Sequence, residues 1–187
     1  LWSGRTGPED MGRSIAIRAD ERDWNLVITA GPMTYFRDPS WNPAPYQKRV
    51  ARNVDALKGP VYRILTYDPA AIAGLRTFCE TAYLGHYHLE TYYYEDESVK
   101  SIGIYAPGAD KGRGLAVVMQ HVGVERDQVM AIGDNQNDLP MFERARWRIA
   151  MGNATLTTRT AATTVAPTHD EEGVAWAVRR YVLDPLG

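Results

Sequence analysis

Strand-like and helix-like segments alternate regularly over residues 107–187, and this pattern constrains the fold more than any other feature of the sequence. Short apolar runs with the composition of buried strands lie at 128–132, 148–151 and 164–166. Segments with apolar residues at helical spacing lie around them, at 111–121, 139–145, 155–162 and 174–182. Such alternation is typical of a parallel sheet with helices on both faces. We therefore predict an α/β fold.

The middle of the chain has a different texture. Its segments are, in order, a loop with three prolines at 37–45, a helix at 46–57, a strand at 61–67, a helix from Pro69 to about Tyr83, and strands at 86–94 and 98–105. This order predicts a mostly antiparallel sheet with helices on one side. Residues 1–35 read as loop, helix and strand, like the end of the chain. We predict a core of residues 1–35 and 107–187, interrupted by an inserted α+β cap of residues 36–106.

Composition excludes several classes of protein. The 187 residues carry 21 basic and 23 acidic side chains, so no basic excess indicates a nucleic-acid or anionic membrane partner. No apolar run reaches the roughly 18 residues that a membrane span needs. The lone Cys79 excludes an internal disulfide framework and a multi-cysteine zinc site. The chain begins at Leu1 without a charged-then-apolar leader, which we interpret as a cut end of a cytoplasmic protein. Nothing in the pattern indicates an oligomeric state.

Polar residues gather in the segment 133–138, directly after the apolar run 128–132. Asp134 and Asp138 supply carboxylates, and Asn135 and Asn137 supply amides. Ligands of open α/β sheets bind at the carboxyl ends of the strands, and oxygen donors suit a hard cation such as Mg²⁺. The alternative is a polar turn in which Asp138 caps the next helix.

Two weaker signals point to an anion. Lys111 follows a loop with Pro107 and Gly108 and begins a helix, where a cation opposes the helix dipole unless an anion is bound nearby. Ser3 and Gly4 follow a possible strand end, where a hydroxyl and a glycine amide can hold phosphate oxygens. Taken alone, each also fits a plain surface lysine or a plain turn. The lysine segment lacks the Gly-Lys-Ser/Thr ending of a P-loop.

The combination of these motifs resembles the haloacid dehalogenase-like hydrolase superfamily, and within it the Cof-type sugar-phosphate phosphatases with a large cap. The resemblance rests on Lys111, the segment 133–138, and the segments 150–154 and 172–175. It covers residues 107–183 almost continuously and residues 1–35 more weakly. It implies a Rossmann-like core, with the cap inserted between its two parts.

The resemblance also implies roles in phosphate binding. Ser3 and the Gly4 amide would hold the transferring phosphoryl group, and Asn137 would contact it. Lys111 would neutralise the phosphate and an aspartyl-phosphate intermediate. Charge neutralisation and alignment are most of what phosphoryl transfer requires of a protein. The implied substrate is a small phosphorylated metabolite, in particular a sugar phosphate.

The implied metal is Mg²⁺, with Asp134 as its ligand. Asp138 would hold either Lys111 or the waters bound to the metal. Asp134 and Lys111 are thus the catalytic residues that the resemblance implies, and Asp134 and Asp138 the residues of the metal site.

The sequence departs from the family in one respect that bears on activity. The family's nucleophile and acid/base lie in an Asp-x-Asp-Gly-Thr motif at the end of the first strand, and no such motif occurs in these 187 residues. In the family's order, this motif precedes Ser3. We therefore expect this chain to be a fragment, lacking the nucleophile and the first core strand, of a phosphatase. The alternatives are a non-catalytic protein that binds phosphate or a partner, and a transferase such as a phosphomutase.

Overall fold

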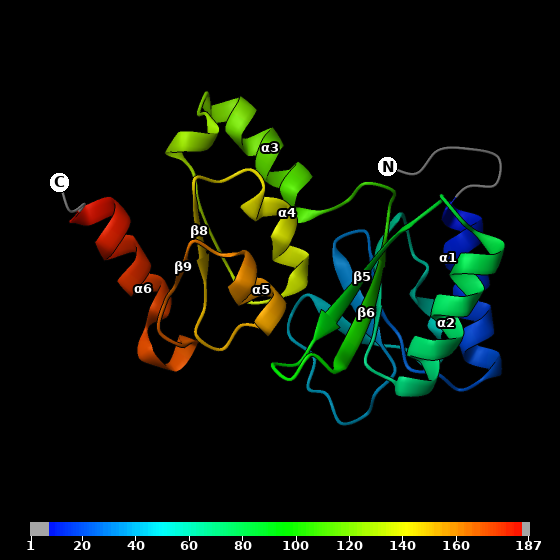
Figure 1. Ribbon diagram of the computed structural model, residues 1–187. Helices are drawn as coiled ribbons and strands as arrows, with labels where there is room; N and C mark the ends of the chain where they lie inside the picture. The colour runs from blue at the N-terminus through cyan, green and yellow to red at the C-terminus, as the bar shows by residue number, and fades with distance from the viewer. Residues whose placement is uncertain (1–7, 185–187) are drawn as a thin grey trace. The chain divides into compact units, whose positions relative to one another are not determined.

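The computed structural model describes residues 8–184, which divide into two compact units. Unit 1 contains the described residues up to Thr91 together with Lys100–Gly108, and unit 2 contains Tyr92–Val99 and the described residues from Ala109 onward. The chain therefore passes between the units three times. The elements of both units are labelled in Figure 1.

Unit 1 is built on a six-stranded sheet with the strand order β3-β2-β1-β4-β6-β5. The strands are β1 Val27–Ala30, β2 Met33–Phe36, β3 Gln47–Arg49, β4 Val61–Thr66, β5 His88–Tyr93 and β6 Val99–Tyr105. The pairs β1–β2, β1–β4 and β4–β6 are antiparallel, whereas β2–β3 is parallel. The predicted antiparallel character of this part of the chain is therefore confirmed.

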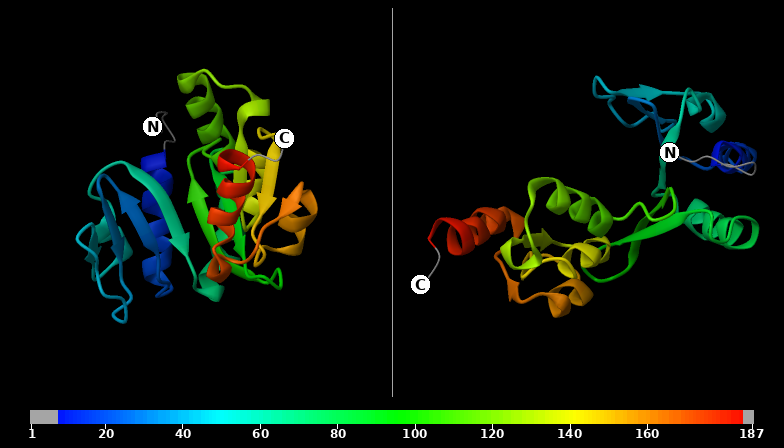
Figure 2. Two further views of the ribbon diagram at one scale, coloured as in Figure 1. Left: turned by 90° about the vertical axis from the view of Figure 1, so that its left-hand side faces the viewer. Right: turned by 90° about the horizontal axis from the view of Figure 1, so that it is seen from above.

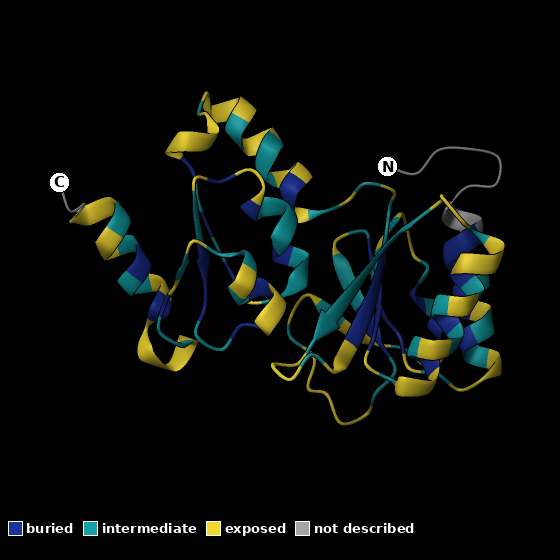
Figure 3. Cartoon of the chain, viewed as in Figure 1, coloured by how far each residue is buried: buried dark blue, intermediate teal, exposed yellow. Residues whose placement is uncertain are grey.

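Two helices, α1 Pro8–Glu21 and α2 Pro69–Ala82, lie together on one side of this sheet (Figure 1). Ile15 of α1 and Leu75 of α2 are fully buried against Ile28 of the sheet. Figure 3 shows exposed residues on the outer faces of both helices. Asp68 begins α2 as predicted, because its carboxylate accepts hydrogen bonds from the first free backbone N–H groups of the helix. Cys79 lies on the face of α2 that packs into the core of unit 1, and its burial raises the pKa of the thiol to about 12.

Unit 2 contains a parallel sheet with the strand order β7-β8-β9. Its elements are β7 Met130–Gly133, β8 Trp147–Ala150, β9 Thr164–Val165, and the helices α3 Lys111–Val122, α4 Leu139–Phe142, α5 Leu156–Ala161 and α6 Gly173–Val178. Alternate residues of β7 contact different helices, because side chains alternate across a strand. Ala131 packs with α3 and α4, whereas Met130 and Ile132 pack with α6. Figure 2 shows the helices of unit 2 around this sheet.

This arrangement confirms the predicted α/β fold with helices on both faces of a parallel sheet. No helix in the described range 8–184 is long and apolar enough to cross a membrane.

The predicted helix over 46–57 is wrong. The structure has the short strand β3 Gln47–Arg49 there, followed by a single 3-10 turn, Asn53–Ala56. The reason is tertiary: the Asp20 carboxylate accepts hydrogen bonds from the backbone N–H groups of Asn53 and Val54 and from the Asn53 side chain. Val50, Val54 and Leu57 still pack against the core, so the apolar spacing marked burial and not a helix.

The division into units also differs from the predicted one. Residues 8–35 lie in unit 1 and not with residues 109–184, because β1 pairs with β4 in an antiparallel register that joins Val27 to Leu65. Residues 92–99, which we had placed within the cap, belong to unit 2. A short β-branched run such as residues 26–29 fits either sheet equally well, and the sequence therefore did not distinguish between the two.

Candidate active site

The segment 133–138 forms a tight loop at the carboxyl end of β7. The Met151 N–H group donates a hydrogen bond to the Gly133 carbonyl oxygen at 2.9 Å, and Thr155 N–H donates to the Asp134 carbonyl oxygen at 3.1 Å. These bonds tie the loop to the segment that follows β8. Asp134 is exposed at this edge of the sheet.

Asp138 is the buried acceptor at the centre of this loop, with 3% of the residue exposed. One carboxylate oxygen, Oδ1, contacts Lys111 Nζ at 2.5 Å. The other, Oδ2, accepts hydrogen bonds from the backbone N–H groups of Asp134 at 3.0 Å and Asn135 at 3.2 Å. A buried carboxylate is costly unless such donors surround it. Asp138 stands at the N-cap position of α4, as the alternative interpretation has it, but its side chain makes no capping bond to that helix.

Gly133 makes room for this arrangement. A Cβ atom built on Gly133 would lie 2.4 Å from Asp138 Cβ and 2.7 Å from Asp138 Oδ2. Such a distance is far inside van der Waals contact, so a side chain at position 133 and the observed position of Asp138 exclude each other. The glycine is therefore a packing requirement of the site.

Lys111 is the first residue of α3. Asp110 begins the helix, because its side chain accepts a hydrogen bond from Arg113 N–H at 2.8 Å. Gly112 lets the helix start approach α4 closely, since an added Cβ would lie 2.5 Å from the Pro140 carbonyl oxygen. The Lys111 side chain is 45% exposed while its amine contacts the buried Asp138. This contact offsets the unfavourable position of a cation at a helix N-terminus and leaves the amine open to an anion on its exposed side.

A second set of contacts joins the loop to residues 92–99, which form the tip of the β5–β6 hairpin. The Asn135 side chain pairs with the backbone of Tyr93: Nδ2 donates to the carbonyl oxygen at 2.7 Å, and Oδ1 accepts from N–H at 3.2 Å. The Glu97 Oε1 atom accepts from the Thr157 backbone N–H at 2.9 Å and from the Thr157 hydroxyl at 2.6 Å. The sequence predicted a solvated turn at 95–97 and gave no sign of these contacts, because they join residues far apart in the chain.

The Glu97–Thr157 contact is expected to depend on pH. The pKa of the Glu97 carboxyl is lowered by the hydrogen bonds from the Thr157 hydroxyl and backbone N–H. A carboxyl with a lowered pKa in the folded state contributes stability above its ordinary pKa of about 4.3, and this stability is lost as the pH falls through the lowered value. The NMR shift of the Thr157 amide should follow that titration.

The Met151 amide is the reference for this titration, since it donates to the Gly133 carbonyl and has no titrating partner. In Glu97→Gln the Thr157 amide should become insensitive to pH, because the amide oxygen still accepts but does not titrate. If Thr157 and Met151 respond only together, the shift reports general unfolding and the assignment to Glu97 is wrong.

The structure thus brings together some of the predicted site residues. Lys111, Asp138 and the backbone of Asp134 share one hydrogen-bonded group, and the half-buried Asn137 lies in the short turn between Asp134 and Asp138. Ser3 and Gly4 lie outside the described residues. Both oxygens of Asp138 already accept hydrogen bonds, which favours its predicted role of holding Lys111 over direct metal ligation.

The donors of this loop fit Mg²⁺ through Asp134. Within residues 8–184, no group of three His, Cys, Asp or Glu side chains is placed to hold a metal by itself. Mg²⁺ does not require such a group, because it usually keeps several waters and takes one or two carboxylates together with substrate phosphate. Asp134 offers one exposed carboxylate of this kind.

The sequence model of one family, described as haloacid dehalogenase-like hydrolase, matches residues 58–178 of the chain. The chain belongs to this family. The matched range contains Lys111, Asp134 and Asp138 and thus the whole hydrogen-bonded group described above. The suspected superfamily is confirmed.

Curated relatives match less than half of this haloacid dehalogenase-like chain. It is 38% identical over 80 residues to "Endoribonuclease YBEY, chloroplastic" from Arabidopsis thaliana, covering 43% of this chain and 14% of that protein. It is 40% identical over 82 residues to a phosphoglycolate phosphatase from Methanothermobacter thermautotrophicus, covering 44% and 37%. It is 38% identical over 88 residues to the 5-amino-6-(5-phospho-D-ribitylamino)uracil phosphatase YcsE from Bacillus subtilis, covering 47% and 35%. The matched part spans little more than a third of these relatives at most.

Solved structures of the same family share the fold of this haloacid dehalogenase-like chain. A haloacid dehalogenase-like hydrolase from Bacteroides thetaiotaomicron superposes with a TM-score of 0.74 at 23% identity, covering 92% of this chain and 66% of that one. The HAD subclass IIB sugar phosphatase BT4131 superposes with a TM-score of 0.72 at 18% identity, with the same coverage. At these identities the likeness establishes the fold.

Proposed function

We propose that this haloacid dehalogenase-like hydrolase is, in its whole form, a Mg²⁺-dependent phosphatase of small phosphorylated metabolites, in particular sugar phosphates. The observation that carries the proposal is the contact between Lys111 and the buried Asp138, next to the exposed Asp134 at the carboxyl end of β7. This edge of an open α/β sheet is where ligands bind. The names of the phosphatase relatives support the same class of reaction.

Each residue of the site has a proposed role. Lys111 faces the phosphate and balances its negative charge, while Asp138 holds the lysine amine in place from the buried side. Asn137 contacts a phosphate oxygen, as do Ser3 and the Gly4 amide. Asp134 would hold Mg²⁺, which supplies further charge neutralisation and alignment of the phosphoryl group.

The proposed reaction needs a nucleophile that these 187 residues do not supply as an Asp-x-Asp-Gly-Thr motif. An aspartate oxygen of the whole protein would attack phosphorus in line, and the bond from phosphorus to the substrate oxygen would break. Water would then hydrolyse the aspartyl-phosphate and release inorganic phosphate. The chain spans only part of the length of its relatives.

We assign the phosphate chemistry to Ser3, Gly4 and residues 109–184, which carry the other proposed site residues. The residues 36–106, predicted as a cap, would supply contacts to the part of the substrate that is not phosphate. A core-and-cap division of this kind would let one phosphate site serve different metabolites through different caps.

Turnover of an aryl phosphate tests the proposal. The 187-residue chain alone should show no turnover with Mg²⁺ present, because loss of a nucleophile removes the covalent route. The whole protein should turn over with Mg²⁺ present, and Asp134→Ala should raise the Mg²⁺ concentration that turnover requires. Turnover by the 187-residue chain that Asp134→Ala abolishes would show that the nucleophile lies in this chain. A whole protein that binds inorganic phosphate without turnover would favour the non-catalytic alternative, which the missing motif suggests.

A further inference from the structure

Unit 1 contains a pocket of about 220 Å³, and all of its lining residues lie between Asn25 and Asp68 of this unit. Its base is formed by Leu26, Val27 and Phe36, of which Leu26 and Phe36 are 1% exposed. These residues come from the start of β1 and the end of β2. Their burial gives the pocket a fixed apolar base that excludes water, which is typical of small-molecule sites.

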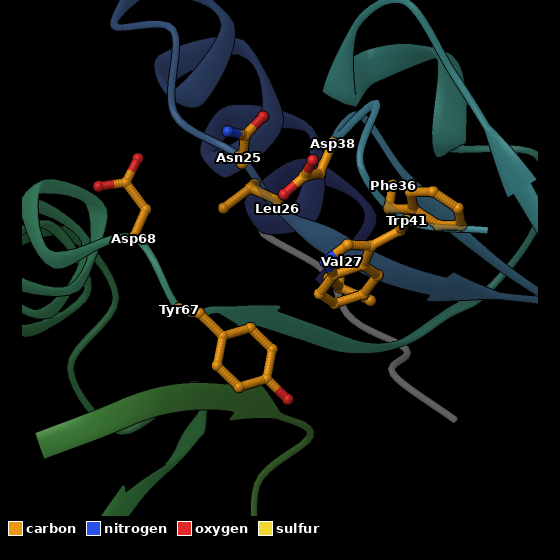
Figure 4. Close-up of a pocket in the computed structure, with 8 residues that line it drawn as sticks. All are labelled: Asn25, Leu26, Val27, Phe36, Asp38, Trp41, Tyr67 and Asp68. Atoms are coloured by element: carbon orange, nitrogen blue, oxygen red, sulfur yellow. The ribbon is translucent and has the colours of Figure 1, made fainter. Parts of the chain in front are cut away.

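Aromatic rings form the sides of this pocket (Figure 4). The ring centroids of Phe36 and Trp41 are 5.5 Å apart, and those of Trp41 and Tyr67 are 6.1 Å apart in an edge-on arrangement. Trp41 is 37% exposed and Tyr67 45% exposed, so both rings have surface available to a ligand. Aromatic rings placed around a small space attract cations through their negative faces.

The charged groups of the pocket are both acidic. Asp38 is held in a fixed turn, because its Oδ1 atom accepts hydrogen bonds from the Ser40 backbone N–H at 2.8 Å and the Ser40 hydroxyl at 2.7 Å. These bonds hold the pKa of the Asp38 carboxyl below its ordinary value, so the group is anionic at neutral pH. Asp68 lies on the other side, where its Oδ1 atom caps α2. Neither carboxylate forms an ion pair within the described residues.

The nearby arginines are engaged elsewhere. Arg37 donates to Asp23 and to the Trp24 and Ala51 carbonyl oxygens. Arg49 lies close enough to lower the pKa of Asp38, but its guanidinium donates to the carbonyl oxygens of Pro39 and Trp41. Neither arginine lines the pocket. The charged groups that do line it, Asp38 and Asp68, therefore favour a positively charged ligand and disfavour phosphate.

We propose that this pocket binds a small organic cation, with its ammonium group near Asp38 and Trp41 and its apolar body against the exposed rings of Trp41 and Tyr67. The ligand is inferred from charge complementarity, because two carboxylates and two exposed aromatic rings line the same pocket. The two carboxylates would repel a phosphate group, so the group bound in this pocket is cationic and is not the phosphate of the proposed phosphatase's substrate. The site does not depend on that proposal.

A charge series on one molecular shape tests this inference. The 187-residue chain is titrated with benzylamine, benzyl alcohol and benzoate, and the indole NMR signal of Trp41 is followed. Benzylamine should bind about tenfold more tightly than benzyl alcohol, as expected for a partly desolvated cation on aromatic rings. Benzoate should not shift the signal. Equal binding of the amine and the alcohol, or tighter binding of benzoate, would overturn the proposal.

The chain offers a matched pair of variants. Asp38→Asn removes the charge but keeps an oxygen that accepts the Ser40 hydrogen bonds. Asp96 accepts the same two hydrogen bonds from Ser98 in unit 2, so Asp96→Asn makes the same chemical change far from the pocket residues in the chain. Asp38→Asn should abolish the preference for the amine, and Asp96→Asn should retain it. If both variants behave alike, the preference does not come from the pocket, and the proposal fails.

Discussion

Replacing Lys111 with alanine is expected to lower the turnover of the whole protein by about 10²–10³-fold, the range for losing one preorganised charge-stabilising group. The lysine amine is fixed by the buried Asp138 on one side and exposed on the other, so it needs no rearrangement to meet a phosphate. Mg²⁺ affinity should remain nearly unchanged, because the proposed metal ligand is Asp134. Turnover and Mg²⁺ affinity, both measured on the same variant, separate the two roles.

Three further variants serve as comparisons. Asp134→Ala should weaken Mg²⁺ binding, and part of its lost turnover should return at high Mg²⁺ concentration. Lys111→Arg should rescue turnover only in part, because a planar guanidinium replaces a compact point charge. Arg113→Ala, two residues further along α3, is the matched control for removing a cation from this helix. If Lys111→Ala were as active as the unchanged protein, the phosphate-binding role of Lys111 would be wrong.

Replacing Gly133 with alanine is expected to lower the free energy of unfolding of the 187-residue chain by about 3 kcal/mol, at the upper end of the range for overpacking. The added methyl group would collide with Asp138 at 2.4 Å. Asp138 is buried, so any movement away from the added methyl group would break its hydrogen bonds with Lys111 and with the two backbone N–H groups. Denaturant unfolding measures the change.

Gly114→Ala is the control for this prediction. Gly114 lies in α3, and an added Cβ would meet nothing within 4 Å. The same glycine-to-alanine change should therefore stabilise the chain by up to about 1 kcal/mol, the usual preference for alanine in a helix. A Gly133→Ala variant as stable as the unchanged chain would show that the loop can relax, and that Gly133 is not a packing requirement.

The sequence predicted unit 2 more accurately than unit 1, for a physical reason. The strands β7 and β8 are short, mainly apolar runs that place Ala131, Ile149 and Ala150 in the core, and the helices between the strands have one apolar face, so pattern and structure agree from α3 to α6. In unit 1, the start of α2 was equally predictable, because Asp68 followed by Pro69 is a strong helix-start signal. The prediction of a helix over 46–57 was wrong, because hydrogen bonds from Asn53 and Val54 to Asp20 override the helical spacing of its apolar residues.

The site was predictable in its residue types but not in all of its contacts. The family resemblance already implied that Asp138 could hold Lys111, and the structure places these two side chains in contact. The resemblance gave no role to Asn135, Glu97 or Thr157. Their contacts join positions 42 and 60 residues apart, and no local pattern reports such pairs.

The position of residues 92–99 in unit 2 has a consequence for the order of folding. Helices and neighbouring strands of unit 2 form through contacts close in sequence, whereas the Glu97–Thr157 bond must close a loop across 60 residues. Loop closure costs entropy before the contact forms, so this bond should form late and break early. A separate domain begun at Ala109, the most obvious point of division, would lack Tyr93 and Glu97. The loop 133–138 would then fold without the backbone of Tyr93, which pairs with Asn135 in the intact chain.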